Sequence, residues 1–395
     1  MRDRRIRAAM AALLLFLSLL AVPAGRAEEP AELTKKCTFT LEPKGSFSVK
    51  EVRDNKYTTY AALGVNRSVL IAAKGQPLGS LTLRFYDRAT RTEVWAERNG
   101  EWELATECGA HLSHWVALPE GTTRVRVKNT DKARALFAEM DVYAPGDRPA
   151  DSPVWQDLPR ADLMVAVCHP DDELLWLGGL LPTYAGERGR STLVVYAVPS
   201  TPRRRLELLD GLWHCGVTGY PEFLGRPDIY TKTLAGAYKK WGRNTMAKKV
   251  TALIRRYHPL VVVTHDINGE YGHGGHRAVA DTVTGSVALA ADAASFPDSA
   301  EEYGVWQVQK CYVHLYPEGR VKLDWHVPLT AFGGKDGMAV AREAMAMHVS
   351  QVRHGWAIEE GGDCDNTLFG LYFTAVGADE RGDDLFEHTE RTEGD

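Results

Sequence analysis

Hydrophobic and polar positions follow two different periods along the chain. From about residue 37 to residue 143 they alternate in twos, in short runs that turn residues separate. A period of two predicts strands with one buried face, and many closely spaced short strands are typical of an antiparallel sandwich. The runs with this pattern are CTFTLEP, SFSVKEV, GSLTLRFYD, TEVWAERNGEWEL, HWVALP, TRVRVKN and ALFAEMDVY. We therefore expect an all-β, jelly-roll-like sandwich over residues 33–145.

One hairpin and three tryptophans add detail to this sandwich. Asn99-Gly100 separates two alternating runs, and this dipeptide predicts a two-residue hairpin turn. The strand arrangement resembles discoidin-like or carbohydrate-binding modules. Trp95, Trp102 and Trp115 would stack on sugar rings in such a module, or pack as core and hairpin pairs in a sandwich without that function. The sandwich is therefore a candidate carbohydrate-binding module.

The pattern changes after residues 146–160, whose proline and charge content predicts a linker. Over residues 161–378 apolar runs of strand length (LMVAVC, TLVVYAV, LVVVTH) alternate with helical stretches (PRRRLELLDGLWHCG, NTMAKKVTALIRRYH, GHRAVADTVTGSVALAADA). This alternation predicts an α/β fold: a Rossmann-like, mostly parallel sheet with helices on both faces. Ligands in such sheets bind beyond the carboxyl ends of strands. Residues 379–395 are expected to form a polar tail.

The segment His169-Pro170-Asp171-Asp172-Glu173 directly follows the first of these apolar runs. Carboxylates at the end of a buried strand are costly unless a positive charge lies beside them. A helix start would explain the proline and the acids, since the helix dipole favours acids there, but it would not explain the histidine. A bound metal ion would explain both.

A second source of ligands follows the LVVVTH run, in NGEYGHGGH. His273 and His276 are three residues apart at an expected helix start, so they can project in the same direction. A catalytic zinc ion is held by three His or carboxylate ligands and keeps one open position. His169, Asp172 and His276 satisfy this requirement. Other divalent ions share such sites.

Two ionisable side chains then remain beside the metal. Asp171 is the natural base to take a proton from water, and His273 can donate to a tetrahedral oxyanion or to the leaving group. This arrangement predicts metal-assisted hydrolysis of an amide or ester. His265 and Asp266 would either support a metal ligand from behind or cap the turn at the strand end.

The two motifs, AVCHPDDE and THDINGEYGHGGH, resemble those of the PIG-L/LmbE-like zinc-dependent N-acetylglucosaminyl deacetylases over about residues 163–316. The resemblance implies a zinc-dependent de-N-acetylase, a hydrolase of linear amides, acting on an N-acetylated sugar or glycoconjugate. It implies zinc ligands His169, Asp172 and His276, a general base Asp171 and a transition-state-stabilising His273. It also implies substrate contacts from Arg204, Asp228 and a mobile Tyr271.

The chain departs from the family pattern at two places. Gly274-Gly275 stands where the family usually has Pro-Asp, and we expect this pair to loosen the loop without removing a ligand. Pro182 lies in the middle of the first expected helix of the α/β part, and it predicts a kink or an early end there.

The N-terminus and the charge bear on location and partners. Four arginines precede an apolar stretch of about 15 residues and small residues follow it, which predicts a signal peptide over residues 1–27 and a secreted or cell-surface protein. An uncleaved anchor is the alternative, and it would be the chain's only membrane association. The net charge of -5, with both signs mixed, argues against nucleic-acid binding. The six cysteines form no CxxC pair, and Cys37 and Cys108 are candidates for a disulfide.

Two other functions remain open from sequence. The first is a secreted carbohydrate-binding protein whose metal centre is not catalytic, for which a lost ligand would be the sign. The second is a hydrolase of a different N-acyl amide. The attached sandwich favours a polymeric or surface substrate, because a tethered binding module raises the local concentration of its ligand.

Overall fold

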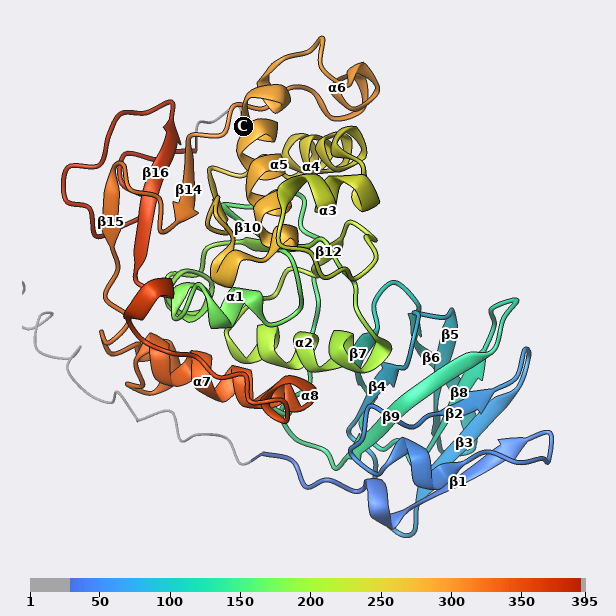
Figure 1. The fold of residues 1–395 in the computed structure, drawn as a ribbon. Coiled ribbons are helices and arrows are strands. Elements are labelled where there is room, and N and C mark those ends of the chain that lie inside the picture. Colours follow the sequence, from blue (N-terminus) through green and yellow to red (C-terminus); the bar gives the residue numbers. More distant parts are fainter. Residues whose placement is uncertain (1–28, 392–395) are drawn as a thin grey trace, which may run out of the picture.

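The computed structural model describes residues 29–391, so the predicted signal peptide lies outside the described residues. Figure 1 shows a β-sandwich beside a larger α/β part. Within residues 29–391 no helix is both long and apolar enough to cross a membrane.

The sandwich consists of a five-stranded antiparallel sheet, in the order β1-β3-β8-β5-β6, and a four-stranded one, in the order β2-β9-β4-β7. Their inner faces bury apolar side chains such as Ile71, Phe85 and Phe137. The elements are η1 (Thr34–Lys36), β1 (Cys37–Glu42), η2 (Val49–Val52), β2 (Ala61–Leu63), β3 (Ser68–Ala73), β4 (Ser80–Phe85), β5 (Thr92–Arg98), β6 (Glu101–Cys108), β7 (Ser113–Ala117), β8 (Arg124–Asn129) and β9 (Ala135–Tyr143). The predicted all-β sandwich is confirmed.

The predicted hairpin is present, and one predicted strand is not. Asn99 and Gly100 join β5 to β6 with φ of +53° and +88°, the left-handed backbone that this turn requires. The run SFSVKEV was expected to be a strand, but it contains the short helix η2. The physical reason is that Val49 and Val52 are three residues apart, which suits a helical turn with Val52 buried.

Two of the three tryptophans proposed as sugar platforms, Trp95 and Trp102, contact other side chains of the sandwich. The guanidinium of Arg126 lies 4.1 Å from the ring centroid of Trp102, and Trp95 Nε1 donates a 2.8 Å hydrogen bond to Glu93. These contacts favour the packing alternative for Trp95 and Trp102.

The α/β part is built on one seven-stranded sheet in the order β12-β11-β10-β13-β14-β16-β15. The strands from β12 to β14 are parallel, and β16 and β15 add an antiparallel edge. Figure 1 shows α3, α4 and α5 on one side of the sheet and α1, α2 and α7 on the other, which confirms the predicted fold class. The strands are β10 (Leu163–Val167), β11 (Thr192–Tyr196), β12 (Glu222–Phe223), β13 (Val261–Thr264), β14 (Lys310–His314), β15 (Arg320–Lys322) and β16 (Leu368–Thr374).

Helices α2, α4 and α5 match the three expected helical stretches closely, and α3, α6, α7 and α8 were not predicted. The helical segments are α1 (Asp172–Leu175), η3 (Pro182–Glu187), α2 (Pro202–His214), α3 (Leu234–Trp241), α4 (Arg243–Tyr257), η4 (Glu270–Gly272), α5 (Gly274–Ala291), α6 (Pro297–Tyr303), η5 (Thr330–Phe332), α7 (Gly337–Met347), α8 (Val349–Val352) and η6 (Gly362–Cys364). The expected first helix is interrupted, but ahead of Pro182 and not at it, because α1 ends at Leu175 and a π-helical segment begins at Pro182.

Helix α2 joins the two parts of the molecule. The hydroxyl of Tyr57 in the sandwich donates a 2.5 Å hydrogen bond to Asp210 on this helix, and Arg205 donates one of 2.7 Å to the carbonyl of Asp87. On its other side α2 carries Arg204, whose guanidinium reaches the end of β10. The same helix therefore contacts both the sandwich and the strand ends where ligands are expected.

Segments expected to be a linker and a tail are packed in the structure. Ser152, in the expected linker, is buried and its hydroxyl lies 2.7 Å from that of Thr82. Leu385 and Phe386, in the expected polar tail, are also buried. Cys37 and Cys108 are buried free thiols, so the candidate disulfide is absent from the described part of the chain.

A buried ion pair fixes this tail, and it yields a stability prediction. Lys310 is fully buried and pairs with Asp379, which also accepts a hydrogen bond from Tyr312. Asp379→Ala leaves a buried ammonium without a partner, so we expect the free energy of unfolding to fall by about 3–5 kcal/mol in denaturant titrations. The matched control is Asp298→Ala, which breaks an exposed pair with Lys248 and should cost at most about 1 kcal/mol. Equal losses from the two replacements would contradict this account.

Candidate metal centre

Two parallel strands bring distant segments of the chain together. Strands β10 and β13 are neighbours in the sheet, with Ala166 paired to Thr264. His169 follows the end of β10, while His276 lies in the first turn of α5, after the loop that leaves β13. Residues more than 100 positions apart in sequence therefore meet at one edge of the sheet, as expected for a parallel α/β sheet.

The predicted ligands converge on one carboxylate oxygen. Asp172 Oδ2 lies 3.3 Å from His169 Nδ1 and 3.4 Å from His276 Nε2. The ring centroids of the two histidines are 5.5 Å apart. Burial alone would raise the pKa of Asp172, but the surrounding imidazoles hold it well below its usual value. Asp172 is thus a buried carboxylate in its charged form, which suits a cation.

His276 is the observation that best tests the fit of a metal. Its ring is fully buried, and Nε2 has no hydrogen-bond partner although Nδ1 lies 2.8 Å from Glu270 Oε2. Burial lowers the pKa of His276, so the ring is neutral with a lone pair available. A buried nitrogen without a partner beside a charged carboxylate fits a bound divalent cation.

Further donor atoms surround these three side chains. Two groups have all their donor atoms within 4.8 Å of one another: Cys168, His169, His273 and His276 form one, and Asp172, His265 and His276 form the other. His276 belongs to both groups, and His169 reaches Asp172 directly. The site therefore offers more donors than the three predicted from sequence.

Glu270 is the functional residue that sequence reasoning missed. Its buried carboxylate lies 2.8 Å from Nδ1 of each of His265, His276 and His314. His265 in turn accepts a 2.9 Å hydrogen bond from the Cys168 backbone N–H, so it supports the β10 loop from behind. The only sequence signal was an acid inside the second motif, and His314 stands on β14, far from either motif.

Asp266 caps the turn at the end of β13, which is one of the two roles that the sequence left open for His265 and Asp266. Its side chain accepts hydrogen bonds from the backbone and the side chain of Asn268, which is a turn cap. His265 alone therefore takes the supporting position.

Asp171 lies beside the ligands but points to a different partner. Its Oδ1 accepts a 3.0 Å hydrogen bond from Arg204, and its backbone adopts φ of +119°, which L-residues rarely take. Burial raises the pKa of Asp171 to about 7 despite the opposing effect of Arg204. A carboxyl group with a pKa near neutrality is suited to general base catalysis.

His273 and Tyr271 border the same cavity. Burial, followed by the nearby His276 and His169, lowers the pKa of His273 to about 4, so its ring is neutral. Tyr271 is 53% exposed and its ring centroid lies 5.6 Å from that of His273. Asp228 approaches from the β12 side, 3.5 Å from His169 Nε2. Every site residue predicted from sequence is thus at this one location.

The cavity holds about 240 Å³. Gln351, Trp356 and Tyr230 also line it, and none of these was predicted from the sequence. They come from loops and a one-turn helix without a motif, so only the folded chain brings them there.

Comparison with known proteins agrees with this geometry. The model of the family GlcNAc-PI de-N-acetylase (PIG-L) matches residues 164–287. Residues 164–287 form a PIG-L domain. Members of this family are hydrolases that act on amides, and the buried His/Asp cluster of the domain is suited to their metal dependence.

Individual relatives cover parts of the chain. The 1D-myo-inositol 2-acetamido-2-deoxy-alpha-D-glucopyranoside deacetylase of Rhodococcus jostii is 29% identical over 51% of this chain and 70% of its own length. Among solved structures, the N,N'-diacetylchitobiose deacetylase of Pyrococcus horikoshii matches 48% of this chain and 71% of its own, with 18% identity and a TM-score of 0.36. The family 32 carbohydrate-binding module of C. perfringens NanJ matches 29% of this chain and 98% of its own, with 16% identity and a TM-score of 0.25.

The paired glycines of the PIG-L domain are tightly packed, so the expected loosening of the loop is wrong. A Cβ on Gly275 would lie 2.9 Å from Cys168 Sγ and 2.9 Å from the ring of His273. A Cβ on Gly274 would lie 2.6 Å from the carbonyl oxygen of Thr233. Both glycines belong to the first turn of α5, where the close approach of neighbouring segments leaves no room for a side chain.

The position of Glu270 in the PIG-L domain leads to a metal-affinity prediction. Glu270→Gln keeps the shape of the side chain, but its amide cannot accept hydrogen bonds from three imidazoles at once. We therefore expect the affinity for zinc to fall about 10- to 100-fold. Competition with a fluorescent chelator measures this. The matched control is Glu318→Gln on an exposed turn, which should leave affinity unchanged. An unchanged affinity in Glu270→Gln would show that the three histidines need no common acceptor.

Proposed function

We propose that this protein is a zinc-dependent hydrolase that removes the acetyl group from an N-acetylglucosamine-type sugar or glycoconjugate. The observation that carries the proposal is the convergence of His169 and His276 on Asp172, next to the buried carboxyl group of Asp171. The position of this cluster within a PIG-L domain supports the amide as the bond that is cleaved.

His169, Asp172 and His276 would hold the cation. A divalent cation there supplies Lewis acidity, which polarises the acetyl carbonyl and lowers the pKa of water. Zinc matches two imidazoles and one carboxylate with a position left open.

The chain's own residues then move the protons. Asp171 takes the proton of the attacking water as the new C–O bond forms, and Arg204 holds its carboxylate in place. The neutral ring of His273 donates a hydrogen bond to the oxygen of the tetrahedral intermediate. When the C–N bond breaks, the proton held on Asp171 passes to the departing amine, so acetate and a free amine leave.

The walls of the cavity support a sugar as substrate. Trp176, Tyr271 and Trp356 place their rings within 6.2 Å of one another, and aromatic faces pack well on sugar rings. Arg204, Asp228 and Tyr271 are the proposed substrate contacts at the rim. The Rhodococcus relative is named for the deacetylation of a 2-acetamido-2-deoxy-glucopyranoside, which supports this substrate class.

We also propose that the protein acts outside the cytoplasm, at the cell surface or secreted. The arginine-led apolar stretch at residues 1–27 supports this location. Sequencing the N-terminus of the mature protein tests it, and a chain that retains Met1 in the cytoplasmic fraction would contradict it.

Acetate release tests the proposed function. A panel of N-acetylated glycans is incubated with the protein, with and without a chelator, and free acetate is measured. We expect release from at least one N-acetylglucosamine conjugate, loss of release to background with chelator, and recovery when zinc is added back. No chelator-sensitive release from any member would contradict the proposal, and release only from other N-acyl amides would replace the substrate class.

A further inference from the structure

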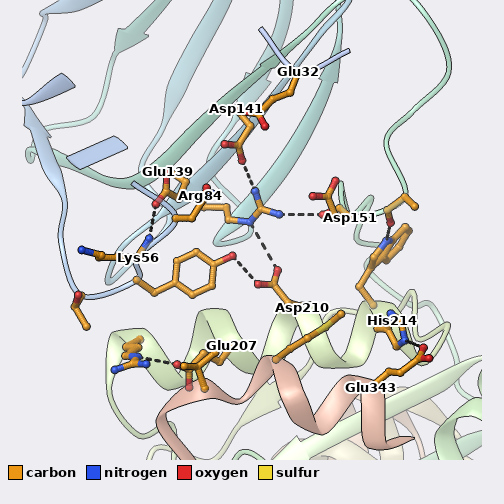
Figure 2. A pocket seen from close by; sticks show the side chains of 18 of the residues that line it. Glu32, Lys56, Arg84, Glu139, Asp141, Asp151, Glu207, Asp210, His214 and Glu343 are labelled. Atoms are coloured by element: carbon orange, nitrogen blue, oxygen red, sulfur yellow. Dashed lines mark hydrogen bonds and ion pairs between the residues drawn. The ribbon is translucent and has the colours of Figure 1, made fainter. Parts of the chain in front are cut away.

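A second and larger cavity lies between the sandwich and the α/β part. Its volume is about 1460 Å³, which exceeds the roughly 300–1,000 Å³ of common small-molecule sites. Figure 2 shows Arg84, Glu139 and Asp141 of the sandwich facing Glu207 and Asp210 of helix α2 across this space, which we call the junction cavity. The PIG-L chemistry does not use any of these residues.

Buried carboxylates outnumber buried cations in the junction cavity. Arg84 donates a 2.6 Å hydrogen bond to Asp141 and one of 2.9 Å to the carbonyl of Asp151, and its Nε lies 3.7 Å from Asp210. This one guanidinium therefore serves two carboxylates. Glu139, only 2% exposed, is a third, and within residues 29–391 no cationic group is bonded to it.

Glu139 has one carboxylate oxygen without a hydrogen-bond partner. Its Oε1 accepts a 2.8 Å hydrogen bond from the Lys56 backbone, but its Oε2 is buried without a partner. Burial is the main cause that raises the pKa of Glu139 to about 8, and Asp141 adds to it. A cation that enters the cavity would stabilise the charged form of this buried carboxyl group.

The shape and chemistry of the cavity favour an organic cation over a metal ion. Among the described residues, no three carboxylate or imidazole donors of this cavity lie close enough together to share an ion. The walls also include the aromatic rings of Tyr57, Trp213 and Phe332. Aromatic rings with separated carboxylates suit a ligand that combines ring faces, hydroxyl groups and ammonium groups.

We propose that the junction cavity binds an amine-bearing oligosaccharide, with a sugar ammonium group at Glu139. The origin of that amine rests on the proposed function, because removal of N-acetyl groups converts a neutral polymer into one with ammonium groups. The protein would thus hold deacetylated units of a polymer in the junction cavity while neighbouring units reach the metal centre.

Two short segments place the junction cavity close to the metal centre. On α2, Arg203 lines the junction cavity and Arg204 lines the metal-centre cavity. On α8, Val349 lines the first and Gln351 the second. Neighbouring residues of α2 and α8 therefore line both cavities.

Titration calorimetry on the full chain tests this proposal. The probe is the fully deacetylated glucosamine tetramer, and cellotetraose is the matched oligosaccharide without amines. We expect the glucosamine tetramer to bind at least about tenfold more tightly than cellotetraose, and Glu139→Gln to remove about tenfold of that affinity, as loss of one charge-assisted hydrogen bond predicts. The control Glu101→Gln, on the exposed hairpin of the same sandwich, should bind like the wild type. Equal affinity for both tetramers, or equal affinity of the Glu139 variant and wild type, would overturn the proposal.

Hydrogen exchange on the wild-type chain gives a second test that needs no variant. With the glucosamine tetramer we expect slower exchange in residues 54–58 and 203–214. Protection confined to residues 169–176 and 271–276 would place the amine at the metal centre and overturn the proposal. If acetate is released but the junction cavity shows no protection from exchange, only the assignment of that cavity is contradicted. If the junction cavity is protected but no substrate releases acetate, only the proposed function is contradicted.

Discussion

Asp171→Asn is expected to lower acetate release about 10²- to 10⁴-fold while zinc content stays at the wild-type level. The amide has the shape of the carboxylate and can still accept the hydrogen bond from Arg204, so the local structure is kept. The amide cannot take a proton from water, and loss of general base catalysis lowers a rate by about 10²- to 10⁴-fold. Initial rates of acetate release and metal analysis of the same sample measure both quantities.

Two outcomes would contradict the role of Asp171. Release within twofold of wild type would show that another group accepts the proton. Loss of zinc together with activity would show that Asp171 serves the cation and not the water. Asp298→Asn, on the exposed helix α6, is the control for the effect of removing one carboxylate from the chain.

His276→Ala is expected to abolish zinc binding at stoichiometric concentrations and to reduce acetate release to background. The imidazole is fully buried and its Nε2, 3.4 Å from Asp172 Oδ2, has no hydrogen-bond partner, so its removal deletes a donor that faces the carboxylate. Loss of a residue that only supports a ligand costs about 10- to 100-fold in affinity, so loss of the ligand should cost more. Zinc per chain after dialysis is the measurement.

The control for His276→Ala is His326→Ala. His326 is an exposed histidine that pairs with Asp336 and Glu360 on the surface. The His326→Ala variant should retain full zinc content and full acetate release. A His276 variant with one zinc per chain and undiminished release would remove His276 from the proposed ligand set.

The location of the site could be predicted because it depends on local rules. Buried parallel strands are apolar throughout, so β10 and β13 are visible in the sequence, and their carboxyl ends share one edge of the sheet. His169, Asp172 and His276 stand directly after those strands or at the start of the next helix. Backbone topology alone therefore brings them together.

Glu270 could not be predicted, because its role depends on side chains from three different elements. Its carboxylate faces His265 after β13, His276 on α5 and His314 on β14, and no sequence spacing links these three. Gln351 and Trp356 were missed for a similar reason, since they reach the cavity from a segment that has no motif of its own.

The sandwich shows where a period of two is sufficient and where it is not. The turn at Asn99-Gly100 was predicted because only a few residue pairs accept left-handed backbone at both positions. The strand predicted for residues 46–52 is wrong, because the three apolar positions of this run fit a helical turn as well as a strand. The junction with α2 lies beyond any periodicity, since Tyr57 and Asp210 meet only through tertiary packing.

The anomalous scattering of a crystal grown with zinc tests the central claim most directly. The account predicts one peak at the zinc edge, with Nδ1 of His169, Oδ2 of Asp172 and Nε2 of His276 each within about 2.0–2.3 Å of it. No peak at this place, or a peak held by Cys168 and His273 in place of Asp172, would contradict it.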